Sequence, residues 1–284
     1  MALRIKAAKA SDDPVAPVRA PSRIRAGTGG WTYAPWRGNF YPAGLVQRRE
    51  LEFASRHVTA IEINGTFYGA QKPASYAAWR AQTPDGFVFS LKAPRYATER
   101  KALASAGTTI KAFVFGGLAE LGDRLGPINW QLPETKRFER DDLAAFFDLL
   151  PRELDGRPLR HVIEVRDASF ADPAYVALAR SHNVATAFTD SPEYPSIADV
   201  TGDFVYARLR CCEKAIPTGY SPQALDAWAR RAREWMHGRA PDDLPRVDTT
   251  KHASGERDVF VYFINGAKER APAAAMALLD RLEA

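Results

Sequence analysis

Residues 161–190, HVIEVRDASFADPAYVALARSHNVATAFTD, contain one complete structural repeat. The segments 161–166 and 185–190 are rich in β-branched and aromatic residues, which is typical of strands. Between them, residues 172–182 carry apolar side chains at spacings of three and four, and Pro173 stands where a helix start is expected. A strand, a helix and a second strand in this order predict two parallel strands joined by a right-handed crossover.

The same alternation extends in both directions along the chain. We predict eight strands, at 23–28, 59–64, 87–92, 128–132, 161–166, 185–190, 203–210 and 258–265. We predict helices at 44–57, 73–82, 110–122, 140–150, 172–182, 222–237 and 268–283. Eight repeats over about 260 residues match a closed α/β barrel of the (β/α)8 TIM type better than an open doubly wound sheet. The gap at 191–202 is too short for a full helix, so we expect the sixth crossover to be abbreviated.

Composition places the chain among ordinary globular proteins. Its 284 residues are 46% hydrophobic, and 39 Lys and Arg against 34 Asp and Glu give a net charge of +5. This mildly basic balance is compatible with an anionic ligand but lacks the long Lys/Arg blocks of a nucleic-acid specialist. No stretch reaches the roughly 18 apolar residues of a membrane helix, and the N-terminus has no signal-peptide h-region. The adjacent Cys211 and Cys212 cannot build a disulfide framework, so we expect a reduced, cytoplasmic location.

The chain shows one domain boundary. Residues 1–22 are rich in Ala, Pro, Lys and Arg and have no helical or strand period, so we expect a disordered N-terminal tail. Residues 23–284 then form a single barrel domain, because no linker or repeat divides them. Within it, the polar stretch 239–257 predicts a long surface loop.

Polar side chains close most of the predicted strands. In 59–64, Ile61 and Ile63 share one face and leave Glu62 and Asn64 on the other. If the apolar face packs on the outer helices, the polar face points into the C-terminal mouth of the barrel, where such barrels place their active sites. The strand-end candidates are Glu62, Asn64, Lys92, Gln131, Glu164, Arg166, Asp190, Arg208 and Asn265.

An alternative explanation of these charges is structural. Three acids, Glu62, Glu164 and Asp190, balance the three bases Lys92, Arg166 and Arg208. Each charge could then be buried and paired in a network that lines the top of the barrel. Against this alternative, barrel interiors consist mostly of Val, Ile and Leu, and buried charge is costly.

Aromatic residues cluster directly after the first two strands. Trp31, Tyr33 and Tyr68 are the members that we assign to ligand contact, as a stacking wall for a sugar ring or a base. A second explanation is that the long first loop needs a small core of its own. The two explanations are compatible.

Several familiar motifs are absent from the sequence. Gly27-Thr28-Gly29-Gly30 follows a strand but lacks the third glycine of GxGxxG, because residue 32 is Thr. The five histidines form neither HExxH nor HxH, and no GxSxG elbow occurs. We therefore expect no metal and no cofactor.

A set of longer motifs resembles the DUF72 family, also called YecE-like proteins. The matching segments are GTGGWTY (27–33), WRGNFYP (36–42), EINGTFY (62–68), WRAQTP (79–84), FSLKAP (89–94), QLP (131–133), EVRD (164–167), YARLR (206–210), YFIN (262–265) and AP (271–272). They cover residues 24–283 in the family's order. The resemblance implies a TIM barrel and leaves the activity open.

The chain departs from the family pattern at three places. Asp167 stands where the family usually has His after EVR, and Arg210 with Cys211 replaces a His-Gly pair. Ile264 before Asn265 replaces the first of two asparagines. If those histidines carry family chemistry, this chain lacks it or uses another group. The strand-end residues that match the pattern are Glu62, Asn64, Lys92, Gln131, Glu164 and Arg166.

These observations predict an enzyme that acts on a polar, anionic small molecule at the barrel mouth. We expect Lys92, Arg166 and Arg208 to hold a phosphate or carboxylate. Glu62 or Glu164 would serve as general acid or base, with Lys92 completing the catalytic set of a hydrolase, lyase or isomerase. A glycosidase ranks lower, because the intervening cations would neutralise its carboxylate pair. The contact set is Trp31, Tyr33, Asn64, Tyr68, Gln131, Arg166, Asp190, Arg208 and Asn265.

Two other classes of function stay open at this point. The first is nucleic-acid binding, or an endonuclease-IV-like phosphodiesterase without the histidine metal site, which shares the basic mouth and the aromatic residues. The second is a partner-binding scaffold without catalysis, which the fold alone does not exclude. The sequence makes no prediction of oligomeric state.

Overall fold

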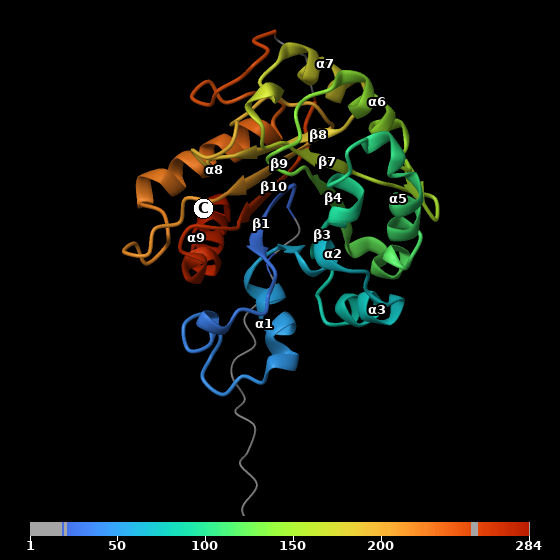
Figure 1. The fold of residues 1–284 in the computed structure, drawn as a ribbon. Helices are drawn as coiled ribbons and strands as arrows, with labels where there is room; N and C mark the ends of the chain where they lie inside the picture. Colours follow the sequence, from blue (N-terminus) through green and yellow to red (C-terminus); the bar gives the residue numbers. More distant parts are fainter. Residues whose placement is uncertain (1–18, 20–21, 251–254, 284) are drawn as a thin grey trace, which may run out of the picture.

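The eight main strands close into an all-parallel barrel, as the sequence predicts (Figure 1). The structure is a computed structural model that describes residue 19, residues 22–250 and residues 255–283. Closure is direct, because β1 pairs in parallel with both β2 and β10. The barrel strands are β1 (Ile24–Gly29), β2 (Ala60–Ile63), β3 (Val88–Lys92), β4 (Leu125–Gln131), β7 (His161–Glu164), β8 (Ala185–Thr189), β9 (Phe204–Leu209) and β10 (Asp258–Phe263).

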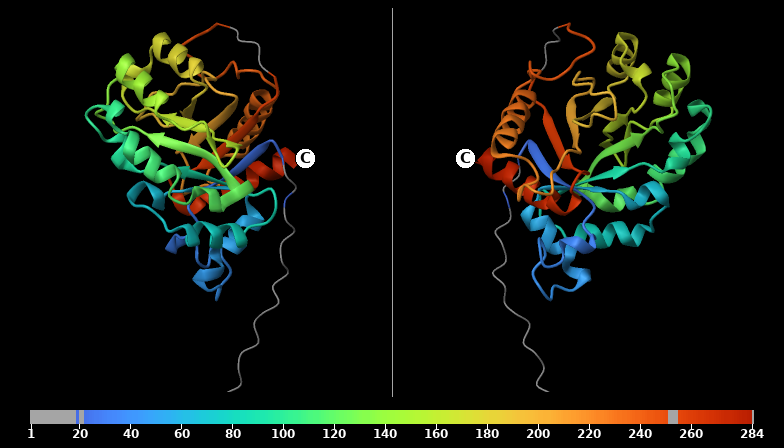
Figure 2. Two further views of the ribbon diagram at one scale, coloured as in Figure 1. Left: turned by 90° about the vertical axis from the view of Figure 1, so that its right-hand side faces the viewer. Right: turned by 60° about the vertical axis from the view of Figure 1, so that its left-hand side comes forward.

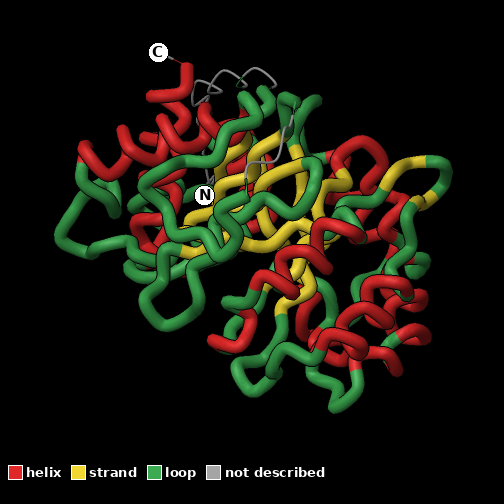
Figure 3. The backbone as a smooth tube through the Cα atoms, turned by 90° about the horizontal axis from the view of Figure 1, so that it is seen from above, coloured by secondary structure: helices red, strands yellow, loops and turns green. Residues whose placement is uncertain are grey.

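Helices surround the strands, as the views in Figures 2 and 3 show. They are α1 (Glu50–His57), α2 (Gly65–Tyr68), α3 (Pro73–Ala81), α4 (Arg95–Thr98), α5 (Gly107–Val114), α6 (Arg140–Asp148), α7 (Pro173–Ser181), α8 (Pro222–Met236) and α9 (Ala271–Glu283). A two-stranded antiparallel hairpin, β5 (Glu153–Leu154) with β6 (Arg157–Pro158), stands between α6 and β7. Within the described residues, no helix is long and apolar enough to cross a membrane.

Helix starts follow the capping signals in the sequence. Pro173 and Pro222 occupy the first turns of α7 and α8, and the Ser221 hydroxyl caps α8 by accepting from the Ala224 amide. The predicted helix at 110–122 is wrong in its extent. It divides into α5 and a 3-10 segment because Gly117 adopts a φ of 131° between them.

The fourth strand begins three residues before its predicted start. The sequence Gly126-Pro127 interrupts a regular strand pattern, and the β3–β4 pairing shifts register at this point. Between β8 and β9 the described chain forms no helix, so the abbreviated sixth crossover is confirmed. The described parts of the predicted loop 239–257 likewise carry neither helix nor strand, and 251–254 lie outside the described residues.

The apolar side chains form two cores, one outside and one inside the strands. Ile61, Phe89 and Ile163 belong to the outer core between strands and helices. The inner core consists of Ala60, Val88, Val162, Ala185, Ala187, Phe204, Tyr206, Phe260, Tyr262 and Ile264. Because strand side chains alternate, polar residues of the same parity at the strand ends lie on the inner side.

The first strand explains the glycine run that resembles a phosphate loop. A Cβ atom on Gly27 would lie 1.6 Å from the Ala60 carbonyl oxygen, and one on Gly29 would lie 2.8 Å from Nδ2 of Asn64. Only glycine permits this close approach of β1 to β2. The run therefore has a packing reason that is independent of any nucleotide.

Most of the predicted tail lies outside the described residues, which omit 1–18, 20 and 21. Arg19 is described, and its guanidinium pairs with Asp280 and Glu283 of α9. The tail's predicted disorder stays a prediction.

Candidate functional site

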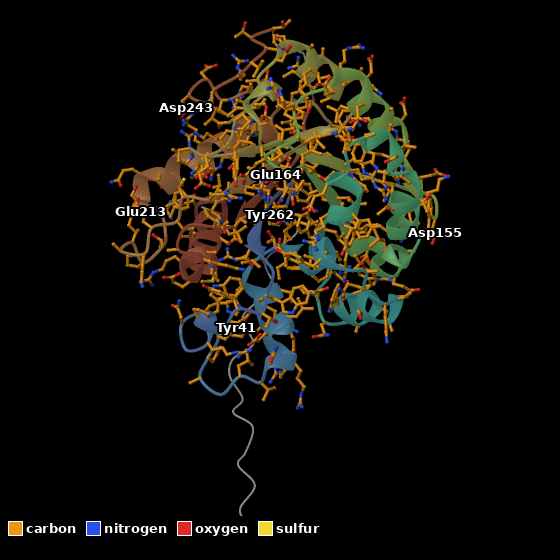
Figure 4. The ribbon with its side chains drawn as sticks, viewed as in Figure 1. Tyr41, Asp155, Glu164, Glu213, Asp243 and Tyr262 are labelled. Carbon is orange, nitrogen blue, oxygen red and sulfur yellow. The ribbon has the colours of Figure 1, made fainter. Side chains whose placement is uncertain are left out.

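The central polar side chains inside the C-terminal end of the barrel come from five strands. They are β2 with Glu62, β3 with Lys92, β4 with Asn129, β7 with Glu164 and β9 with Arg208. All five side chains are buried. Figure 4 shows Glu164 among the strands together with Tyr262.

The guanidinium of Arg208 joins the two glutamates. Its Nε and Nη2 donate to Glu62 Oε2 and Oε1 at 3.0 and 2.9 Å. Its Nη1 donates to Glu164 Oε2, which also accepts from Asn129 Nδ2 at 3.1 Å. The Tyr206 hydroxyl donates to Glu62 Oε2 at 2.6 Å, so both oxygens of Glu62 accept hydrogen bonds. Removing one partner from such a buried network leaves an uncompensated charge.

Glu164 carries a second cation on its other oxygen. Arg166 Nε and Nη2 both donate to Glu164 Oε1, at 3.1 and 3.0 Å. Burial alone would raise the pKa of Glu164, but the charges of Arg208, Arg166 and Lys92 outweigh it and lower the pKa to about 2. Glu164 is therefore ionised at neutral pH.

Lys92 lies at the same mouth outside this hydrogen-bonded network. Its side chain is only 8% exposed, and its Nζ lies 4.1 Å from the centre of the Phe67 ring. No described residue accepts a hydrogen bond from Nζ or forms an ion pair with it. Burial, and next the charge of Arg208, lower the pKa of Lys92 to about 8.

Two amide oxygens on β4 also lack partners. Asn129 Oδ1 and Gln131 Oε1 are buried, and no described residue donates to either. Buried acceptors of this kind are rare unless a ligand or water satisfies them. They add hydrogen-bonding capacity close to Lys92, which pairs with Asn129 in the sheet register.

The rim of the mouth holds two further cations that sequence analysis did not assign to the site. Arg210 and Arg166 both stack on the ring of Tyr194, at 4.9 and 4.6 Å from its centre. Lys268 stands 4.8 Å from the Tyr33 ring, and its electrostatic interaction with Glu62 places it near the network. Burial lowers the pKa of both Arg210 and Lys268.

Charge at the mouth is consequently unbalanced. Among the described residues, Lys92, Arg210 and Lys268 form no ion pair, whereas Glu62 and Glu164 are each paired. The region therefore has an excess of positive charge that its own carboxylates do not neutralise.

Asp190 and Asn265 lie on the outer side of their strands. Ala187 and Ile264 belong to the inner core, and side chains alternate between the two faces of a strand. Asp190 follows Ala187 by three residues and Asn265 follows Ile264 by one, so both point outward. The carboxylate of Asp190 accepts from the Tyr220 hydroxyl and the Arg210 amide, both at 2.6 Å. It fixes the loop after β9, and burial raises its pKa. The Asn265 carboxamide reaches Arg210 Nη2 at 3.1 Å when its oxygen faces the guanidinium.

The aromatic candidates divide between the mouth and the outer core. Trp31 packs edge-on against Trp79 and Phe89, at 5.2 and 6.1 Å between ring centres, which places it between the barrel and α3. Tyr33 stays near the mouth through Lys268. Tyr68 is 67% exposed beside Phe67, the ring under Lys92. The structure thus brings Tyr33 and Tyr68 toward the mouth and does not bring Trp31.

The positions that depart from the family pattern have structural partners. Asp167 accepts from the Ser169 amide at 2.9 Å and caps a 3-10 turn. The Cys211 thiol donates to the Asp190 carbonyl, and burial raises its pKa to about 11, which disfavours the reactive thiolate. In the described part of the chain, no three His, Cys, Asp or Glu side chains are grouped so that they could hold a metal ion.

Comparison with known proteins identifies relatives of the whole barrel. The family model described as "Protein of unknown function DUF72" matches residues 25–284. A solved DUF72 family protein from Thermotoga maritima is 19% identical with a TM-score of 0.69, covering 92% of this chain and 99% of that one. Another, from Enterococcus faecalis, is 17% identical with a TM-score of 0.66, covering 92% and 98%.

A more distant structure shares the fold. The protein named SacUVDE is 12% identical with a TM-score of 0.52, covering 92% of this chain and 98% of its own. Among curated proteins, no match was found.

Proposed function

This chain belongs to the DUF72 family, and we propose that its barrel binds a small anionic molecule, carrying a phosphate or a carboxylate, at the C-terminal mouth. We further propose that Lys92 moves a proton on that ligand. The observation that carries both statements is the isolation of Lys92. It is a buried cation without a carboxylate partner among the described residues, beside a network in which the carboxylates are already paired.

Burial of an unpaired ammonium is unfavourable unless something compensates it. An anion held between Lys92 and Arg210 would supply the missing charge. The excess positive charge of the mouth would also attract an anion electrostatically.

A pKa of about 8 suits Lys92 for proton transfer near neutral pH. At pH 7 most of the side chain is an ammonium ion that can donate a proton, and the neutral amine forms within about one pH unit. Glu164, with a pKa of about 2, is a poor acid and a weak base under the same conditions. We therefore assign Glu62 and Glu164 to holding Arg208 and setting the local field, and the proton-transfer role to Lys92.

Binding measurements with the Lys92→Met variant test this proposal. Methionine keeps the apolar part of the side chain and removes the charge. Titration with a panel of phosphate monoesters and small carboxylates should find ligands that the variant binds more weakly by about 1–3 kcal/mol. The matched control is Lys111→Met, which removes an exposed lysine on α5. If both variants bind every anion as well as the wild type does, the mouth is not an anion site.

A nucleic-acid ligand is the second candidate, and the stacking of Arg166 and Arg210 on Tyr194 favours it. Salt dependence separates the two. Binding through several phosphates weakens steeply with salt, whereas a single small anion responds much less. Tight, salt-sensitive binding of an oligonucleotide that Tyr194→Ala abolishes would favour this second candidate. If no anion and no oligonucleotide binds, a scaffold role remains.

Cys211 and Cys212 are free thiols, in keeping with the reducing cytoplasm where we propose that the protein works.

A further inference from the structure

The opposite end of the barrel has its own concentration of positive charge. A cavity of about 340 Å³ lies there, lined on one side by the arginines Arg25, Arg157 and Arg160. Arg25 enters from the start of β1, Arg160 precedes β7, and Arg157 belongs to the β5–β6 hairpin, whose turn residue Asp155 is labelled in Figure 4. The cavity is remote in the fold from the C-terminal ends of the strands, where Lys92 lies.

Arg25 is the least exposed of these three arginines and is incompletely paired. Its side chain is 18% exposed, and its Nε and Nη1 are buried without a hydrogen bond to any described residue. The nearest carboxylate oxygen, Asp258 Oδ2, is 3.9 Å from Nη1, too far for a hydrogen bond. Burial lowers the pKa of Arg25, which reflects the cost of holding its charge there.

The acids at this end do not neutralise the arginines. Asp258 is shared, because Arg160 Nη1 donates to it at 2.7 Å. Asp123 also lines the cavity, but Arg80 and Arg124 occupy its oxygens. Among the described residues Arg157 forms no ion pair. Three arginines thus face one available carboxylate.

The arginines are also held in position before any ligand arrives. The guanidinium groups of Arg25 and Arg160 lie 5.6 and 5.9 Å from the centre of the same Phe260 ring. This cation–π packing fixes the spacing of the two guanidinium groups. Planar groups arranged in this way match the oxygens of a phosphate or carboxylate.

We propose that this cavity is a second anion site, which binds a small organic phosphate or carboxylate. A water molecule occupies about 30 Å³ in the liquid, so the cavity holds more than an inorganic ion. Val88, Leu125 and Phe260 provide apolar wall for the rest of the ligand. The site is independent of the function proposed for the mouth.

The test separates the two ends of the barrel by calorimetric titration. Phenyl phosphate, benzoate and inorganic phosphate are the probes, titrated into the wild type and into Lys92→Met protein. At least one organic probe should bind Lys92→Met protein at one site per chain, more tightly than inorganic phosphate does. Comparison of phenyl phosphate with benzoate shows which anionic group the site prefers.

Adding Arg25→Met should weaken that binding at least tenfold without loss of folding, since Arg25 makes no hydrogen bond from Nε or Nη1. Arg157→Met is the second variant, because this exposed side chain can be changed without effect on the core, and it should weaken binding several-fold. Arg140→Met removes an exposed arginine on α6 and should change nothing.

Two results would overturn the inference. One is the absence of any probe binding in the Lys92→Met protein. The other is binding that Arg25→Met and Arg157→Met leave unchanged. Neither result bears on the role proposed for Lys92. That role is tested by whether Lys92→Met protein binds anions more weakly than the wild type does.

Discussion

Lys92 and Arg208 both enter the mouth of the barrel as buried cations, but only Arg208 is held by carboxylates. Arg208 donates to Glu62 and Glu164 through three nitrogens. Lys92 Nζ lies over the Phe67 ring and has no hydrogen-bond acceptor among the described residues. The mouth of the barrel therefore contains a structural cation and an available one. This difference predicts that the same substitution, to methionine, lowers the free energy of unfolding at Arg208 but not at Lys92.

Arg208→Met should destabilise the protein by about 3–5 kcal/mol, because it leaves two buried carboxylates without their shared partner. Lys92→Met should leave the free energy of unfolding unchanged within about 1 kcal/mol or raise it, since no hydrogen bond is lost and an unpaired buried charge is removed. Denaturant melts of both variants measure the two effects. A loss on the larger scale for Lys92→Met would show that Lys92 belongs to the structural network.

Stability at low pH should depend on Glu164. Its folded-state pKa of about 2 is below the ordinary value of 4.5, so its contribution is complete above pH 4.5 and is lost as the pH falls toward 2. Glu164→Gln should remove that contribution. The difference in unfolding free energy between wild type and variant should therefore be largest above pH 4.5 and shrink steadily below it. A difference that does not change between pH 5 and pH 2.5 would contradict the pairing of Glu164 with Arg208 and Arg166.

The glycine run should prove to be structural. Gly27→Ala places a Cβ 1.6 Å from the Ala60 carbonyl oxygen, which requires β1 and β2 to separate. We expect loss of folding or destabilisation well beyond the 1–3 kcal/mol typical of core overpacking. Gly30→Ala is the comparison, because a Cβ there meets nothing within 4 Å, although its φ of +80° adds strain. If Gly27→Ala is no worse than Gly30→Ala, the strand contact is not what requires glycine.

The period of two along each strand was enough to predict the centre of the site. Glu62, Lys92, Glu164 and Arg208 alternate with apolar residues that pack on the helices, so parity alone predicts their face. The assumption that the last residue of each strand faces inward is wrong for Asp190, because Asp190 shares its face with Phe188 of the outer core and lies beyond the strand end at Thr189. The barrel is predictable from local patterns, because most repeats carry a strand pattern followed by a helix pattern.

Residues from loops could not be predicted in this way. Tyr194 comes from a segment without a period, Lys268 stands at the very start of the predicted last helix, and only tertiary packing brings the two to the rim. The face of Asn129 follows from the same alternation, because Asn129 precedes Gln131 by two residues on the same strand. The pairing of Arg208 with both glutamates depends on side-chain geometry across the barrel, which a single sequence does not specify.

The most direct test of the account is the titration of Lys92 itself by NMR. Protein with 13C-labelled lysine is compared with Lys92→Met protein to assign the Cε signal, which is followed with pH in chloride and in phosphate at equal ionic strength. We expect a pKa of about 8 for Lys92 in chloride and a higher value in phosphate, because a bound anion stabilises the ammonium form. A pKa near the ordinary 10.5 in chloride, or one that phosphate leaves unchanged, would contradict the claim that Lys92 is an unpaired cation awaiting an anion.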